Sequence, residues 1–151
     1  MKTEQWIKKL GGHAGELYVA AELSKRGIPN ALLPENFSGD DLIAGTKDGK
    51  RLCFIQVKSC HPDRANTFIL RETDEKWKDA PENHFVVFVW LGSPNKNESP
   101  KFWITTKKAV GLKCVEDSAH GTPNWERRFS PKQFPDEWEN NWTEIMQYLE
   151  K

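Results

Sequence analysis

Three polar residues, Asp41, Gln56 and Lys58, flank two short apolar segments that the sequence brings together. An Asp48-Gly49 pair separates the two segments, and an Asp-Gly pair between apolar runs is a strong signal for a β-hairpin. Such a hairpin folds Asp41 back beside the strand that carries Gln56 and Lys58. A carboxylate, an amide and an ammonium gathered in one place are typical of a metal-dependent active site, so we expect the chemistry of this chain here.

The second apolar segment, residues 52–57, predicts a central strand that is buried on both faces. Side chains two positions apart share a face of a strand, so Gln56 and Lys58 lie on the same side as Phe54. Because an unpaired buried amide costs roughly 2–7 kcal/mol, this placement requires a compensating interaction. In the structural alternative, Lys58 marks the point where the strand leaves the core and Gln56 bonds to neighbouring backbone.

A fourth candidate, Glu16, lies in the segment 15–26, which predicts a helix that ends at Gly27. At 3.6 residues per turn, Glu16 falls within the apolar arc, whose members are Leu17, Val19, Ala20, Ala21 and Leu23. The alternative is a capping role, in which an acid near the helix N-terminus gains about 0.3–1 kcal/mol from the helix dipole. That role explains the position of Glu16 along the helix but not its inward direction.

With these residues, the chain resembles the PD-(D/E)XK nuclease superfamily, and within it the Mrr-type restriction endonucleases and the archaeal Holliday junction resolvase relatives. The segments GELYVAAELSKRG, DDLIAG and FIQVKS carry the resemblance, which covers the chain to about position 60. It implies a restriction-endonuclease-like α/β fold, in which a mixed central β-sheet is flanked by α-helices.

The resemblance also implies a role for each candidate. In the family, a helix glutamate, an aspartate, a Glu, Asp or Gln, and a lysine two residues later surround one or two magnesium ions. These roles fall here to Glu16, Asp41, Gln56 and Lys58, and the carbonyl of Val57 is the backbone ligand that the resemblance implies. The expected cofactor is therefore Mg²⁺, with Mn²⁺ as a substitute.

The sequence departs from the family pattern in two places. No proline precedes the aspartate, and Gln56 occupies the position that is usually acidic, a variant that the Mrr-like branch also uses. Asp41 directly precedes the apolar strand, as the pattern requires, and Asp40 is the alternative ligand. Magnesium prefers about six oxygen ligands, and Gln56 removes one negative charge, so we expect a magnesium requirement on the order of millimolar. Lys58 would orient or deprotonate the attacking water and neutralise charge in the transition state.

Length and composition set the wider limits. At 151 residues we expect one domain, residues 1–151. No apolar stretch approaches the length of a membrane span and the first residues lack the apolar core of a signal peptide, so we expect a cytoplasmic protein without a membrane partner. The three cysteines, Cys53, Cys60 and Cys114, lack C-x-x-C spacing, which favours reduced thiols over a disulfide framework or a structural zinc site.

The net charge is zero, with 22 basic and 22 acidic side chains, which argues against a protein that coats nucleic acid without specificity. Basic residues gather between positions 101 and 132 and acidic ones near the C-terminal end. This distribution is compatible with a basic face opposite an acidic one, and equally with ordinary solvated charge.

The remaining pattern predicts strands over 67–70, 85–91 and 102–106, a helical turn over 73–79, and a last helix over 135–150. A stripe on that helix is expected to enter the core and consists of Trp138, Trp142, Ile145, Met146 and Leu149. Trp77 and Trp125, which have charged neighbours, are the candidates for stacking on an unpaired base.

Together these features predict a magnesium-dependent nuclease that hydrolyses phosphodiester bonds, and they favour a DNA endonuclease of restriction, repair or mobile-element defence. An RNA-cleaving nuclease or toxin is one alternative, because the same metal site can cut either polymer. The other is an inactive nuclease-fold module that binds nucleic acid or a protein. The expected partner is nucleic acid, and the sequence leaves a homodimer open.

Overall fold

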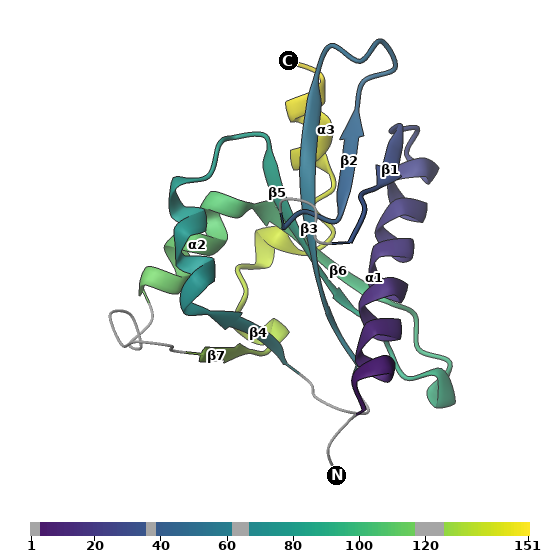
Figure 1. Cartoon of the computed structure of the whole chain (residues 1–151), viewed down its shortest axis with the longest axis vertical. Helices are drawn as coiled ribbons and strands as arrows, with labels where there is room; N and C mark the ends of the chain where they lie inside the picture. The colour runs from purple at the N-terminus through teal and green to yellow at the C-terminus, as the bar shows by residue number, and fades with distance from the viewer. Residues whose placement is uncertain (1–3, 36–38, 62–66, 117–125) are drawn as a thin grey trace.

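The structure is a computed structural model that describes residues 4–35, 39–61, 67–116 and 126–151. Within these ranges, five strands form the main sheet (Figure 1), in the spatial order β1 (Asn30–Leu32), β2 (Leu42–Gly45), β3 (Leu52–Cys60), β5 (His84–Trp90) and β6 (Lys101–Thr106). β3 and β5 run parallel and the other neighbouring pairs are antiparallel. The sheet is therefore mixed.

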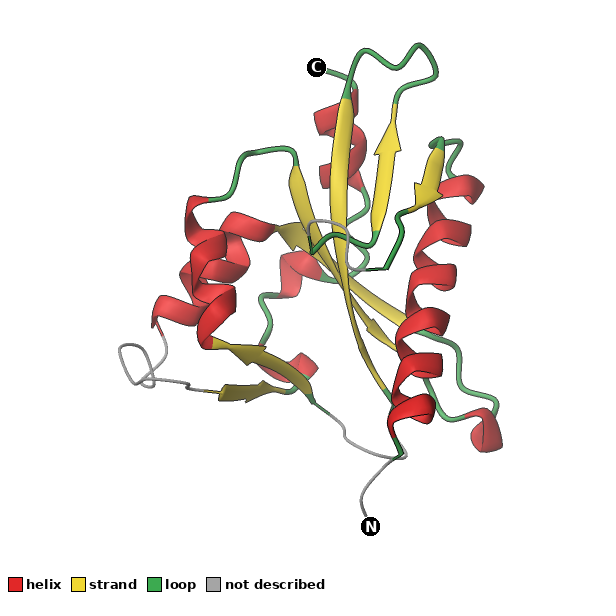
Figure 2. Cartoon of the chain, viewed as in Figure 1, coloured by secondary structure: helices red, strands yellow, loops and turns green. Residues whose placement is uncertain are grey.

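Helices and a small second sheet cover the main sheet (Figure 2). The α-helices of the described chain are α1 (Gln5–Lys25), α2 (Lys107–Glu116) and α3 (Thr143–Leu149). The small sheet pairs β4 (Phe68–Arg71) with β7 (Glu126–Phe129). Short 3₁₀ helices are η1 (Glu72–Asp79), η2 (Pro94–Lys96), η3 (Pro131–Gln133) and η4 (Asp136–Trp138). This arrangement confirms the predicted fold class, an α/β fold with a mixed central sheet flanked by helices.

The predicted hairpin is present, with Leu42 opposite Ile55 and Gly45 opposite Leu52. Its turn relies on Gly49, whose φ of +74° strains any residue with a side chain. Asp48 stabilises the turn by accepting hydrogen bonds from the Lys50 backbone N–H at 3.0 Å and from the Thr46 hydroxyl at 2.7 Å. This turn fixes the register that brings Asp41 beside β3.

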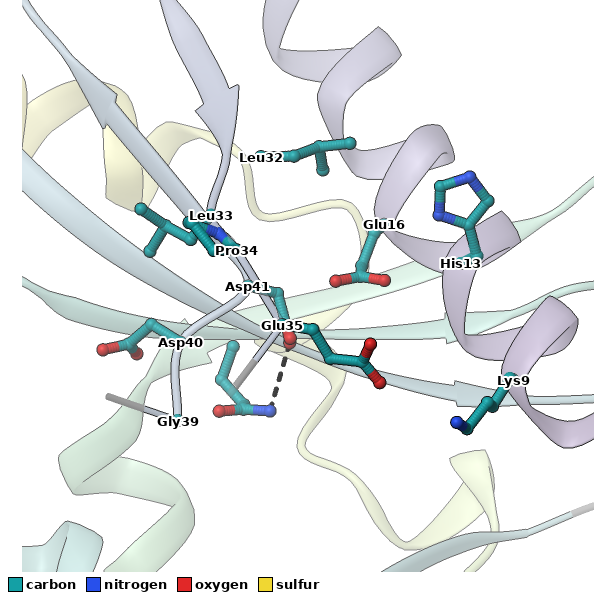
Figure 3. A pocket seen from close by; sticks show the side chains of 11 residues that line it. Lys9, His13, Glu16, Leu32, Leu33, Pro34, Glu35, Gly39, Asp40 and Asp41 are labelled. Atoms are coloured by element: carbon teal, nitrogen blue, oxygen red, sulfur yellow. Dashed lines mark hydrogen bonds between the residues drawn. The ribbon is translucent and has the colours of Figure 1, made fainter. Parts of the chain in front are cut away.

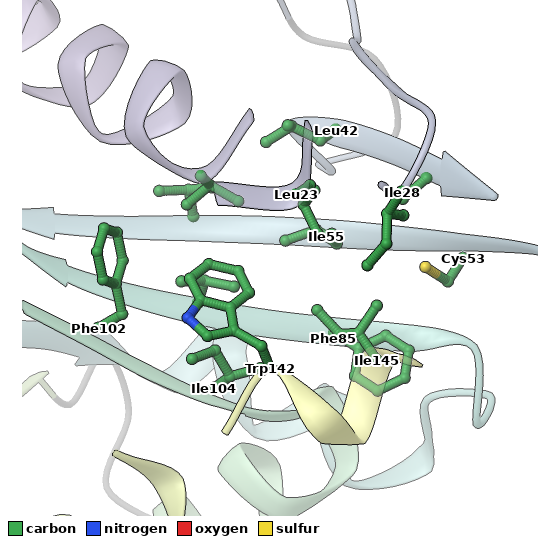
Figure 4. Packing of buried hydrophobic residues seen from close by; sticks show 14 of the residues in the cluster. Leu23, Ile28, Leu42, Cys53, Ile55, Phe85, Phe102, Ile104, Trp142 and Ile145 are labelled. Carbon is green, nitrogen blue, oxygen red and sulfur yellow. The ribbon is translucent and has the colours of Figure 1, made fainter. Parts of the chain in front are cut away.

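Each face of the sheet has its own hydrophobic core. On one face, α1 and α3 supply side chains such as Leu23, Trp142 and Ile145, which pack on Ile55 and Phe85 (Figure 4). The other core lies under α2, η1 and the small sheet, and it includes Phe68, Val86, Phe88, Phe134 and Trp138. Consecutive residues of β5 alternate between the two cores, so β5 is buried on both faces.

β3 differs from the prediction that it is buried on both faces. Cys53, Ile55 and Val57 are buried, but Gln56 and Lys58 on the opposite face are only half-buried. The physical reason lies in the neighbouring strand, because pairing with β2 stops at Leu42 while β3 continues beside β5 to its last residue. The part of β3 after Ile55 is thus not paired with β2, and we call this side of it the bare edge of β3.

Helix predictions were correct in part. α1 begins at Gln5, ten residues before the predicted start, and Leu17 is 48% exposed although it was assigned to the apolar arc. The predicted last helix is interrupted, because Asn140 adopts a left-handed φ of 53°. Trp138 consequently packs in one core and Trp142 in the other, so the predicted single stripe divides between the two faces.

The remaining expectations concern the cysteines, a membrane-spanning helix and Trp125. The three cysteines are buried and form no disulfide, and burial raises the pKa of Cys53 to about 12 and that of Cys60 to about 11. In the part of the chain that the structure describes, no helix is long and apolar enough to span a membrane. Trp125 lies outside the described residues.

α1 lies in direct contact with β3, and Gly15 makes this contact possible. A Cβ at position 15 would lie 1.8 Å from the Ser59 Oγ and 3.3 Å from a methyl group of Val57. Only the absence of a side chain therefore lets the helix approach this closely. The contact sets the position of the next residue, Glu16, relative to the strand.

This contact predicts opposite effects for two glycines of the same helix. Gly15→Ala should destabilise the protein by about 1–3 kcal/mol through overpacking. Gly12→Ala should stabilise it by up to about 1 kcal/mol, because alanine favours the helix and a Cβ there meets nothing within 4 Å. Urea unfolding of both variants measures the difference, and equal stability of the two would contradict the close packing of α1 on β3.

Candidate metal and catalytic site

Asp41 lies at the bare edge of β3, immediately before β2 begins. Its Oδ2 accepts a hydrogen bond from the backbone N–H of Val57 at 2.7 Å and another from the Gln56 Nε2 at 3.1 Å (Figure 3). Its own backbone N–H donates to the carbonyl of Ile55 at 2.9 Å. Beyond the last backbone pair of β2 and β3, the side chain of Asp41 thus takes the place of a backbone partner for Val57.

The carbonyl of Val57 points to the same edge. In a strand, the N–H and C=O of one residue point toward the same neighbouring strand, and the Val57 N–H points to Asp41. β2 supplies no backbone partner at this position, because its last pair with β3 is Leu42 and Ile55. The carbonyl oxygen predicted as a ligand is therefore directed toward the Asp41 side of the strand.

Glu16 enters the same site from α1. It lines one cavity of about 540 Å³ with Asp41 and Gln56, and Figure 3 shows its carboxylate directed toward Asp41. The remaining lining residues of this cavity are Lys9, His13, Leu32, Leu33, Pro34, Glu35, Gly39 and Asp40. The predicted inward direction of Glu16 is thus correct.

The two carboxylates disturb each other's ionisation. Burial, the nearby charge of Asp41 and a hydrogen bond with Asp41 raise the pKa of Glu16 to about 7, and Glu35 adds to the rise. Burial also raises the pKa of Asp41, although the hydrogen bond from Val57 opposes this effect. Because the two acids hold a proton at neutral pH, a bound cation would stabilise their charged forms.

Asp40, the alternative ligand, has a different environment. Its Oδ1 accepts a hydrogen bond from the Lys107 Nζ at 2.6 Å, and the two residues are only 5% and 6% exposed. His84 Nδ1 lies 3.8 Å from the other carboxylate oxygen, and burial lowers the pKa of this histidine. Asp40 is thus held in a buried ion pair, whereas Asp41 faces Glu16 and Gln56.

Lys58 lies beside this cavity and lines a second one further along β3. Its positive charge lowers the pKa of Asp41, which places the ammonium within electrostatic reach of the carboxylate. The Lys58 Nζ also lies 5.5 Å from the ring centroid of Trp77, and the Lys107 Nζ lies 5.4 Å from the same centroid. The structure therefore brings Glu16, Asp41 and Gln56 into one cavity and Lys58 to its border.

Trp77, predicted as a base-stacking residue, is half-buried against the second core. Its position depends on Gly111 of α2, because a Cβ there would lie 2.0 Å from the backbone nitrogen of Lys78. The cation–π contacts with two lysines stabilise the ammonium groups next to the ring. Through this contact, Trp77 thus helps to position the Lys58 ammonium.

The donor set is compatible with a hard cation. Among the described residues, no three His, Cys, Asp or Glu side chains converge as metal ligands. The donors present at the edge of β3 are two carboxylates, one amide and one carbonyl, all of which offer oxygen, the element that Mg²⁺ prefers. Their low total charge agrees with weak binding of the ion.

Several residues of the site were not predicted from the sequence. Lys9 and His13 line the cavity from α1, seven and three residues before Glu16, and Glu35 enters from the loop after β1. The helical spacing is a usable signal, but Gly11 and Gly12 are unfavourable in a helix and hid its true start. Lys107 belongs to the basic residues of positions 101–132, which we expected on a basic face or as ordinary solvated charge, whereas it is buried.

Comparison with known proteins bears on the fold. No family model matches the chain, and no curated protein matches it by sequence. Among solved structures, the chain is similar to a bacterial homing endonuclease, I-Ssp6803I, with a TM-score of 0.55 and 15% sequence identity. The match covers 92% of this chain and 93% of the other. The two proteins therefore share a fold over almost their whole lengths.

The raised pKa of Glu16 predicts how stability depends on pH. Between the ordinary value of 4.5 and about 7, the folded protein holds a proton that the unfolded chain has lost, so the contribution of Glu16 to stability declines as pH rises. Relative to Glu16→Gln, the wild type should lose on the order of 1 kcal/mol between about pH 5 and pH 8, because partial exposure screens the effect. Urea unfolding in chelator measures this loss, and parallel pH profiles would contradict it.

Proposed function

We propose that this protein is a magnesium-dependent nuclease that hydrolyses phosphodiester bonds. The observation that carries the proposal is the convergence of Glu16, Asp41 and Gln56 in one cavity, with the Val57 carbonyl directed to the same edge and Lys58 at its border. This set of groups agrees with the resemblance to the PD-(D/E)XK nucleases, and we propose the Mrr-like branch with glutamine at the acidic position.

We propose DNA as the substrate. One protein with a similar fold is a homing endonuclease, and the match extends over 92% of this chain. Shared fold alone does not define function, so the proposal rests on the fold together with the chemistry of the cavity. RNA cleavage and binding without cleavage are the outcomes that the assay must separate from it.

Each residue has a specific task in the proposed reaction. Asp41 would hold Mg²⁺ through its Oδ atoms, helped by the Gln56 Oε1 and the Val57 carbonyl. A bound Mg²⁺ supplies Lewis acidity, which polarises the phosphate and favours ionisation of water. Lys58 places a positive charge where the attacked phosphate gains negative charge, and it orients the attacking water. Glu16 faces Asp41 in the cavity and would help to hold the ion or its water.

The direct test is incubation of purified protein with labelled duplex, single-stranded and branched DNA and with RNA. Each substrate is tested with Mg²⁺, with Mn²⁺ and with chelator. The proposal predicts cleavage of DNA that requires a divalent ion. Cleavage of RNA alone supports the RNA-cleaving alternative, and tight binding without any cleavage supports the binding module.

Lys58→Ala should lower the cleavage rate by about 10²–10⁴-fold, as expected for loss of a positioned catalytic group. The fold should remain intact, because the Lys58 side chain is only half-buried. Lys47→Ala, in the hairpin turn, is the matched control and should retain full activity. Rates at saturating Mg²⁺ measure the effect, and unchanged cleavage in a nuclease-free preparation would show that Lys58 is structural.

Asp41→Asn should instead raise the Mg²⁺ concentration needed for activity.

Gln56→Glu should have opposite effects with and without metal. The amide nitrogen of Gln56 donates to Asp41, so a glutamate at position 56 places two carboxylates against each other and destabilises the protein in chelator. In Mg²⁺ the additional charge should lower the half-saturating concentration of the ion. Thermal unfolding across a Mg²⁺ titration measures both effects. A Gln56→Glu protein with the metal response of the wild type would show that residue 56 does not contact the ion.

A further inference from the structure

A second cavity, of about 560 Å³, lies beside the proposed catalytic cavity. Gln56 lines the first cavity and Lys58 the second, and these two residues are neighbours on one face of β3. α1 also contributes to both, with Glu16 lining the first cavity and Lys8 and Gly12 lining the second. A linear ligand that reaches Lys58 from the first cavity would therefore enter the second.

The charges of the second cavity differ from those of the first. Its described lining includes Lys8, Lys58, Arg71 and Arg128 together with His61, and it contains neither an aspartate nor a glutamate. The four cationic side chains come from α1, β3, β4 and β7, so the fold gathers them from distant parts of the sequence. In a protein of zero net charge, this concentration of one sign favours an anionic ligand.

The lining also contains apolar surface. Phe68, Ile69 and Leu91 line the cavity, and Ile69 is the most exposed of the three. A free inorganic anion needs no such surface. A nucleotide unit does, because its phosphate suits the basic side chains while its sugar and base have apolar faces.

Gly12 supports the same conclusion. Glycine inside a helix costs about 1 kcal/mol relative to alanine, and a Cβ at position 12 would meet nothing within 4 Å. Packing therefore does not require this glycine, in contrast to Gly15. Its effect is to leave the α1 wall of the second cavity without a side chain at this position.

From these observations we infer that the second cavity is a subsite for a nucleotide that flanks the cleaved bond of the substrate strand. Lys8, Arg71 and Arg128 contact its phosphate, and the partly exposed side chain of Ile69 accepts its sugar or base. Lys58 lies between the subsite and the catalytic cavity, so it contacts the strand where the bond is cut. This inference rests on the proposed nuclease function for the identity of the ligand.

The test is equilibrium binding of a fluorescent DNA oligonucleotide in chelator, measured by anisotropy over a range of salt concentrations. Lys8→Gln should weaken binding about threefold to tenfold, as expected for one charged contact to phosphate. It should also reduce the slope of log K against log salt by about 0.7–0.9. Lys25→Gln is the matched control, because Lys25 lies on the same helix with its side chain 73% exposed, and it lines neither cavity.

Gly12→Leu tests the shape of the subsite. Leucine favours the helix and has open space at this position, so thermal stability should be equal to or higher than that of the wild type. Binding should nevertheless weaken several-fold, because the new side chain narrows the cavity. A gain in stability together with a loss in affinity cannot come from misfolding.

The outcomes separate this inference from the proposed function. If the wild type cleaves DNA but Lys8→Gln and Gly12→Leu bind as tightly as Lys25→Gln, the subsite is refuted and the nuclease function stands. If the wild type binds DNA without cleaving it and both variants weaken binding, the subsite stands and the nuclease function is refuted. If the wild type cleaves DNA but does not bind it in chelator, the subsite is refuted and the nuclease function stands, and if it neither binds nor cleaves DNA, both are refuted.

Discussion

The hydrogen bond from the Val57 backbone N–H to the Asp41 carboxylate, at 2.7 Å, is the interaction on which the site depends. β3 is longer than β2, so its C-terminal part presents backbone groups that β2 does not pair. Unpaired backbone groups at a sheet edge destabilise the fold when they are buried, and when they are exposed they can pair with another chain. Asp41 satisfies one of them with a side chain, and this holds a carboxylate beside a carbonyl and an amide in a fixed geometry.

The electrostatic consequence follows from the second carboxylate. α1 approaches β3 closely at Gly15, which brings Glu16 into the cavity of Asp41. The pKa values of both acids rise, so without a cation the pair keeps a proton at neutral pH. The buried ion pair of Asp40 and Lys107 shows the other solution to the same problem, in which a neighbouring acid is neutralised within the protein. In our account, a divalent ion neutralises Asp41 as Lys107 neutralises Asp40.

The sequence predicted the local features better than the long-range ones. The Asp48-Gly49 turn and the two-residue period of β3 determine where Asp41, Gln56 and Lys58 lie, and both signals are local. The buried position of Lys107 and its pairing with Asp40 could not be predicted, because residues 67 positions apart meet only through the sheet order. The helix start at Gln5 was missed since Gly11 and Gly12 oppose helix formation locally, and the contact at Gly15 depends on packing against β3.

The central claim is that Asp41, Gln56 and the Val57 carbonyl bind a divalent ion at the bare edge of β3. Crystals soaked in Mn²⁺ test it most directly, since anomalous scattering locates this ion independently of any activity. Our account predicts an anomalous peak about 2.0–2.3 Å from the Asp41 carboxylate and the Val57 carbonyl oxygen, and its loss in Asp41→Asn. A peak beside Asp40 and His84 instead, or no peak at Asp41 in Mn²⁺ concentrations that support cleavage, would contradict it.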